Sequence, residues 1–124
     1  MPVKPKEYIT ASARFLVYEN YIVAEPNQYV DVSHQEVDDL HDVVKENMKG
    51  PFGLIENRPN ETSINPMVYK RAKELMPDLK AFALVSNSRT TIASFKLEQA
   101  FMKGIKSAIY ASLDDAKEWM ESVL

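Results

Sequence analysis

The distribution of apolar residues along the chain is the feature that most constrains its fold. Short runs rich in β-branched and aromatic residues alternate with segments long enough to form a helix. Strands separated by helix-length crossovers pair in parallel, whereas two runs joined by a two-residue turn form an antiparallel hairpin. The sequence predicts one hairpin, followed by alternating helices and strands. The runs expected to form strands are residues 12–18, 21–25, 52–56, 80–86 and 107–111.

Helix start signals occur between these runs. Ser33 and Glu36 have the spacing of a capping box, in which the two side chains satisfy backbone N–H groups at the helix start. Asn65 precedes Pro66, as an N-cap precedes a proline at the first helical position. Helices are therefore expected from residue 33 to Gly50, over 65–76, over 89–102, and from residue 112 onwards.

These elements predict one α/β domain over residues 1–124, a length that suits a single core. The expected order is β-β-α-β-α-β-α-β-α. It corresponds to a mostly parallel five-stranded sheet with one antiparallel strand. The continuous apolar centre of 80–86 is typical of a strand covered on both faces.

Composition excludes several classes of function. There is no cysteine, so disulfides, thiolate metal sites and a cysteine nucleophile are excluded. The three glycines, Gly50, Gly53 and Gly104, have spacings that fit neither a dinucleotide-binding fingerprint nor a phosphate-binding P-loop. A net charge of −3 argues against nucleic acid as a partner. No apolar run is long enough to span a membrane and no targeting segment is evident, so we expect a soluble, cytoplasmic protein.

The second half carries a family resemblance. It reads as a strand (AFALVS), a polar turn (NSRTT), a helix (ASFKLEQAF), a strand (KSAIYAS) and a last helix (LDDAKEWMESVL). This pattern resembles the SpoIIAA-like proteins of the STAS superfamily, whose chains often end in a strand followed by S-x-x-x-A-x-x-W-[LM]. Ser112, Ala116, Trp119 and Met120 occupy those places. The resemblance implies a STAS fold and a regulatory, protein-binding role.

Related anti-sigma-factor antagonists carry a phosphorylatable serine in an Asp-Ser-Ser-Gly-like turn. The matching stretch, residues 57–65, lacks that turn, and Thr62 and Ser63 lie nearest to the equivalent place. SEC14-related proteins suggest a second role by analogy, the binding of an apolar or lipid ligand.

Two polar loops are expected at the carboxyl edge of the sheet, where ligands of open α/β sheets bind. Their arginines and hydroxyls, beside helix N-termini, suit an anion or a protein partner. The plainer alternative is that Ser88 caps a helix and that the others are ordinary turn residues. The predicted ligand or partner site contains Arg58, Thr62, Ser63, Ser88, Arg89 and Thr90.

The helix over 89–102 has an apolar arc wider than one buried face needs. Phe95, Leu97 and Phe101 are therefore predicted to form an apolar docking surface for a partner, a second copy or an apolar ligand. The alternative is a helix that its neighbours bury.

A metal site and catalysis find little support. His34, Asp38 and His41 share one flank of a helix, but no further strong ligand is identifiable, and a solvated acidic face explains them. Neither histidine has a recognisable nucleophile motif near it. We expect no catalytic residue, no metal and no cofactor.

The resulting hypothesis is a non-catalytic binding or regulatory domain of STAS type, acting through protein–protein or small-anion recognition. Self-association, for example as a dimer, is compatible with it. The alternative is a small apolar- or lipid-ligand-binding protein of SEC14-like character. A lipid binder requires a deep cavity lined by Phe and Met, whereas an interaction domain requires a filled core and an exposed patch.

Overall fold

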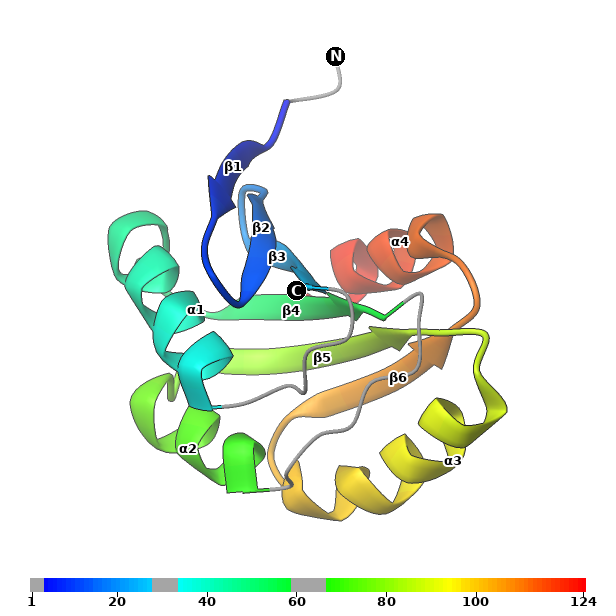
Figure 1. The fold of residues 1–124 in the computed structure, drawn as a ribbon. Coiled ribbons are helices and arrows are strands. Elements are labelled where there is room, and N and C mark those ends of the chain that lie inside the picture. The colour runs from blue at the N-terminus through cyan, green and yellow to red at the C-terminus, as the bar shows by residue number, and fades with distance from the viewer. Residues whose placement is uncertain (1–3, 28–33, 59–66) are drawn as a thin grey trace.

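The helices and strands lie within a few residues of their expected positions, and one further strand precedes them. The computed structural model describes residues 4–27, 34–58 and 67–124. Six strands form one sheet, with helices on both of its faces (Figure 1). The elements are β1 (Lys6–Ile9), β2 (Ala13–Val17), β3 (Tyr21–Pro26), α1 (His34–Asn47), β4 (Phe52–Asn57), α2 (Met67–Leu75), β5 (Leu79–Val85), α3 (Arg89–Glu98), the 3-10 turn η1 (Gln99–Phe101), β6 (Lys106–Tyr110) and α4 (Leu113–Val123).

Strand β1 corrects the expected five-stranded sheet. It pairs antiparallel with β2, and β2 pairs antiparallel with β3, so the sheet has two antiparallel pairs rather than one antiparallel strand. A tight turn joins β1 to β2, in which the Thr10 N–H donates to the Ala13 carbonyl at 2.9 Å. Sequence patterning missed β1 because Lys6, Glu7 and Ile9 are all exposed, and the strand buries no alternating apolar face.

The sheet order is β1-β2-β3-β4-β5-β6, so neighbours in the sheet are also neighbours in the chain. The pairs β3–β4, β4–β5 and β5–β6 are parallel, as the helix-length crossovers between them require. The sheet is therefore mostly parallel at its centre, as the sequence predicted.

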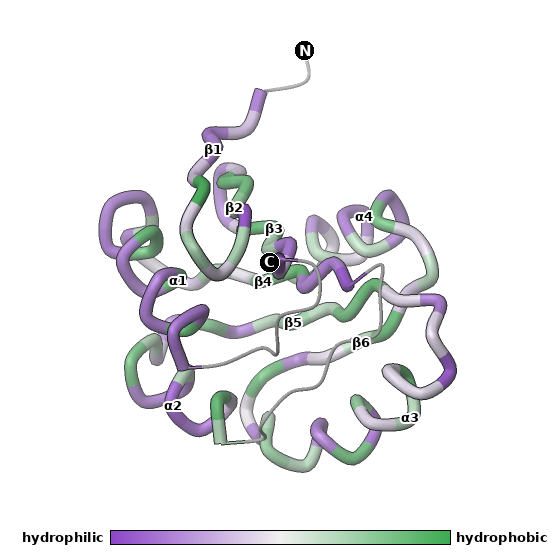
Figure 2. Tube along the Cα trace, viewed as in Figure 1, coloured by the Kyte–Doolittle hydropathy of each residue, from purple (hydrophilic) through white to green (hydrophobic). Residues whose placement is uncertain are grey.

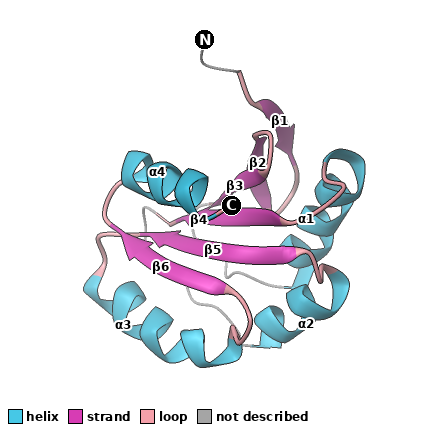
Figure 3. Ribbon diagram, turned by 180° about the vertical axis from the view of Figure 1, so that it is seen from behind, coloured by secondary structure: helices cyan, strands magenta, loops and turns pink. Residues whose placement is uncertain are grey.

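Both faces of the central strands are buried. Because strand side chains alternate, Phe52 and Leu54 of β4 join one apolar cluster with residues of α1, α2 and α3, while Ile55 joins a second cluster with α4. Figure 3 shows α4 on the face of the sheet opposite to α1 and α2. Hydrophobic residues accordingly run through β4 and β5, whereas α1 is largely hydrophilic in Figure 2.

Helix caps account for two of the helix starts. Ser88 accepts a hydrogen bond from the Thr91 N–H at 3.2 Å, and Ser112 accepts one from the Asp115 N–H at 3.2 Å. The predicted capping box involves Ser33, and the predicted start of the second helix involves Asn65 and Pro66; these three residues lie outside the described residues. No helix in the described part of the chain is long and apolar enough to cross a membrane.

Gly53 marks the closest approach of α4 to the sheet. A Cβ atom at this position would overlap the sulfur of Met120 and contact Leu124. A Cβ at Gly50, in the turn before β4, would meet nothing within 4 Å. The absence of a side chain at Gly53 therefore allows α4 to pack directly on β4.

We predict that Gly53→Ala destabilises the fold by about 1–3 kcal/mol, because the added methyl displaces Met120 from a fully buried position. The matched variant Gly50→Ala is expected to change stability by less than about 0.5 kcal/mol. Urea unfolding followed by circular dichroism measures both. Equal stabilities of the two variants would contradict the close packing of α4 on β4.

Candidate functional site

The carboxyl ends of β4 and β5 form one edge of the sheet, as predicted. Arg58 follows β4 directly, and its backbone N–H donates to the carbonyl of Val85, the last residue of β5, at 2.9 Å. Helix α3 begins at this edge, where Arg89 and Thr90 are exposed. Ser88 is the α3 N-cap, which is the plainer of its two interpretations.

Arg58 does not belong to an exposed rim. Its side chain is 1% exposed and points into the core, so it is not available to an anion at the surface. The physical reason is strand alternation: Arg58 continues the inward positions Phe52, Leu54 and Glu56. Thr62 and Ser63, the other predicted residues of this loop, lie outside the described residues.

Phe95 is likewise not part of an exposed docking surface. It is fully buried and stacks on Phe82, with ring centroids 5.7 Å apart. Phe95 and Glu98 lie on the buried stripe of α3, whereas Leu97 is rotated by about 200° from Phe95 and faces outward. Leu97 and Phe101, by contrast, are exposed, at 78% and 45%.

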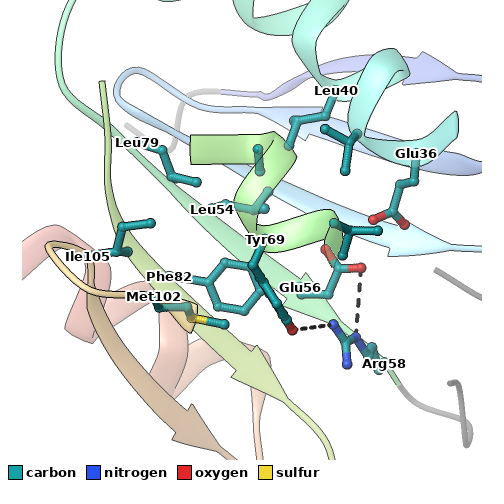
Figure 4. A pocket seen from close by; sticks show the side chains of 13 residues that line it. Glu36, Leu40, Leu54, Glu56, Arg58, Tyr69, Leu79, Phe82, Met102 and Ile105 are labelled. Atoms are coloured by element: carbon teal, nitrogen blue, oxygen red, sulfur yellow. Dashed lines mark hydrogen bonds and ion pairs between the residues drawn. The ribbon is translucent and has the colours of Figure 1, made fainter. Parts of the chain in front are cut away.

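The inward-pointing polar residues line a pocket of about 40 Å³ between the sheet, α1 and α2. Figure 4 shows Glu36, Glu56 and Arg58 at one end of this pocket and Leu79 and Ile105 at the other. The other lining residues, apart from the phenol of Tyr69, are apolar: Val37, Leu40, Leu54, Val68, Ala72, Phe82 and Met102. We call this the Glu36–Glu56 pocket.

One buried carboxylate beside the pocket is fully hydrogen-bonded. Glu98 of α3 accepts from the Tyr69 hydroxyl at 2.5 Å and from the Ser94 hydroxyl at 2.6 Å. Arg58 Nη1 lies 4.0 Å from Glu98 Oε1, and Arg58 Nη2 donates to the Tyr69 hydroxyl at 3.4 Å. Burial raises the pKa of the Tyr69 phenol, so it remains a donor. This network joins α2 and α3 to the end of β4.

The second pair of carboxyl groups is less well satisfied. Glu36 Oε1 and Glu56 Oε1 are buried and have no hydrogen-bond partner within the described structure, and the same is true of Arg58 Nε. The ion pair between Arg58 Nε and Glu56 Oε1 spans 3.8 Å, which is too long for a hydrogen bond. These three atoms therefore have unused hydrogen-bonding capacity at the pocket.

Burial and the proximity of like charge increase the affinity of the two carboxyl groups for protons. Burial, and after it the negative charge of Glu56, raise the pKa of Glu36 to about 10. Burial also raises the pKa of Glu56, although Arg58 opposes that shift. Burial disfavours the charge of Arg58, but the carboxylate of Glu56 raises its pKa above the ordinary value. At neutral pH the two glutamates thus share at least one proton.

The flank of α1 that carries His34, Asp38 and His41 does not assemble a metal site. The Asp38 carboxylate accepts two hydrogen bonds from Arg71 of α2, at 2.6 and 3.1 Å. Among residues 4–27, 34–58 and 67–124, no group of three or more His, Asp or Glu side chains is arranged to hold a metal ion.

Sequence reasoning missed the Glu36–Glu56 pocket, although a signal was present. Glu56 and Arg58 follow two apolar residues at a spacing of two in a strand with buried faces, which places both inside. Glu36 lies four residues before Leu40 on α1, so it shares the buried stripe of that helix. The capping spacing and the acidic neighbours of Glu36 instead predicted a capping residue on a solvated, acidic helix face.

The chain matches no known family model, no curated protein and no solved structure.

We predict that stability falls as the pH rises from about 4.5 to about 10. In this window the folded protein keeps the Glu36 proton, whose pKa is about 10, while the unfolded chain, with an ordinary pKa of 4.5, has lost it. One such proton changes the free energy of unfolding by up to about 1.4 kcal/mol per pH unit. Glu36→Gln mimics the protonated acid and should flatten this dependence.

Urea unfolding across this pH range measures the effect. Asp42→Asn is the matched control, because Asp42 is an exposed acid on the same helix. Parallel pH profiles for the wild type and Glu36→Gln would show that Glu36 does not hold a proton in the folded protein.

Proposed function

We propose that this chain is a non-catalytic binding domain of SpoIIAA/STAS type that recognises an acidic protein partner through α3 and η1. Two features support the STAS part of the proposal. The order of strands and helices agrees with the expected one apart from β1. In the C-terminal motif, Ser112 caps α4, and Ala116 and Met120 are buried against the sheet.

The observation that carries the proposal is the exposure of two large apolar side chains on α3 and η1. Leu97 is 78% exposed and Phe101 is 45% exposed, and they are four residues apart, about one helical turn. Two such neighbours form a small apolar patch that a protein partner can bury. We call Leu97 and Phe101 the α3 patch.

The charge around this patch indicates the chemistry of the partner. From residue 89 to 106 the charged residues are basic except for Glu98, which is buried. The chain as a whole carries −3, so this segment is a local positive region on an acidic protein. An acidic surface would be steered toward it and would meet the α3 patch on contact. The exposed basic residues are Arg89, Lys96, Lys103 and Lys106.

A protein partner is favoured over a free small anion. Arg58 is committed to the buried Glu56 and Glu98, so the rim keeps Arg89 without the second guanidinium that a tight anion clamp would use. The part of the rim that faces solvent in the described structure is thus better suited to surface recognition than to enclosing a ligand.

The Glu36–Glu56 pocket argues against the lipid-binding alternative. Its volume of about 40 Å³ is far below the roughly 300–1,000 Å³ of pockets that enclose drug-sized ligands. Phe82 and Met102 do line it, but Phe82 is packed against Tyr69 and Phe95 rather than against an open channel. An acyl chain has no room there.

We predict that a photoreactive residue at the exposed position Ala100 forms a specific adduct with an acidic protein in the native cell extract. Leu97→Asp should reduce that adduct by about tenfold or more, because it places a negative charge on the patch. Ile9→Asp is the matched control, since Ile9 is equally exposed, at 75%, but lies on β1. Mass spectrometry of the cross-linked peptide identifies the partner protein, and the sequence of that protein gives its net charge.

Thermal unfolding checks that Leu97→Asp keeps the fold, as expected for an exposed position. An adduct that survives Leu97→Asp would contradict the proposal. A basic partner would contradict its acidic-partner component.

A further inference from the structure

Negative charge is in excess around the Glu36–Glu56 pocket. Three buried carboxyl groups, those of Glu36, Glu56 and Glu98, face a single guanidinium, that of Arg58. Hydrogen bonds from Tyr69 and from a serine satisfy Glu98. The uncompensated charge therefore falls on Glu36 and Glu56, and a buried carboxylate without a partner is costly.

The unused hydrogen-bonding capacity of this pair lies at the polar end of the pocket, where Glu56 Oε1 also faces Arg58 Nε at 3.8 Å. Glu36 is 6% exposed and Glu56 is 1% exposed, and Oε1 of each has no partner within the described structure. Both residues line the pocket, and Figure 4 shows their carboxyl groups close together at its polar end. A group that donates hydrogen bonds and carries positive charge is the complement of these two oxygens.

The pocket also sets the size and shape of its ligand. A volume of about 40 Å³ accommodates a molecule of only a few non-hydrogen atoms, since about 10–15 Å³ of such accessible volume suffices for one water molecule. Next to the carboxyl groups the walls are apolar, from Val37 and Leu40 of α1, Leu54 of β4 and Val68 of α2. Such walls suit a methyl group better than the oxygen ligands that a hard metal ion needs.

We infer that the Glu36–Glu56 pocket is a binding site for a small primary ammonium ion of the size of methylammonium. Its N–H groups donate to Glu36 and Glu56, and its carbon packs against Leu40 and Leu54. The site lies inside the fold, so it is distinct from the α3 patch and does not depend on the partner proposed above.

Binding exchanges one cation for one proton. In the free protein the pair retains one proton; when the ammonium ion enters, that proton leaves to solvent and the charge of the site is unchanged. The raised pKa of Glu36 is consistent with a retained proton. Within the described residues, Arg58 after β4 and Asp39 on α1 face the pair, while Tyr69 on α2 and Glu98 on α3 contact Arg58.

Thermal unfolding in methylammonium chloride tests this inference. The unfolding temperature should rise with methylammonium but not with equal concentrations of sodium chloride or tetramethylammonium chloride, which lacks N–H donors and is too large. Because one proton is released, the apparent affinity should increase about tenfold per pH unit between about pH 6 and about pH 8. Stabilisation that is equal in sodium chloride, or that is independent of pH, would overturn the inference.

Glu36→Gln removes the carboxylate and should abolish the stabilisation, whereas Asp42→Asn, an exposed change on the same helix, should leave it intact. A second measurement covers the case in which Glu36→Gln does not fold. In the wild-type protein, methylammonium should shift the methyl NMR signals of Leu40 and Leu54 in a saturable manner, with those of Ile9 unchanged. If methylammonium shifts the NMR signals of all methyl groups alike, or shifts none of them, the pocket holds only water and the proposed site is refuted.

Discussion

Burial of charge at the end of β4 is the constraint on which much of the remaining structure depends. Glu56 and Arg58 lie inside because β4 is covered on both faces and side chains alternate along it. Moving an ion out of water costs several kcal/mol even after relaxation, so such groups persist only where partners surround them. Tyr69 and Glu98 supply those partners from α2 and α3. The positions of these two helices over the sheet are thereby tied to the polar end of one strand.

Helix α3 has two chemically different sides that meet within two consecutive residues. Leu97 faces solvent on the α3 patch, and Glu98 accepts hydrogen bonds inside the protein. Since successive residues of a helix are about 100° apart, one short helix presents an apolar, basic surface outward and an anion inward. The proposed partner site and the proposed ammonium site thus share a scaffold while using different residues, which allows each to be changed without the other.

The architecture could largely be predicted from sequence, because alternation of strand and helix patterns is strong in the middle of this chain. The missed strand, β1, pairs through its backbone and is mostly exposed, so it leaves no apolar periodicity to detect. Helix 89–102 was located well, but Phe95 was assigned to the surface because its wide apolar arc does not indicate which side meets the sheet. Packing against Phe82 determines that Phe95 faces the sheet.

The polar pocket was harder to predict for a different reason. Charged residues in a sequence are normally read as solvated, and Arg58 was assigned to a loop on that basis. Only its spacing from Leu54 and Glu56 in a doubly covered strand indicates burial. The proximity of Glu36 to Glu56 depends on how α1 lies across the sheet, which local sequence does not determine.

The strictly consecutive order of the six strands has a consequence for how the molecule is made. Each strand that leaves the ribosome finds its neighbour already synthesised, so the sheet can grow during translation without long waiting times for distant partners. The face that α4 covers is different, because Val23 and Ile55 stay open to solvent until that last helix docks on them. We therefore expect chaperones to bind nascent chains that are halted before α4, because this apolar face is then exposed.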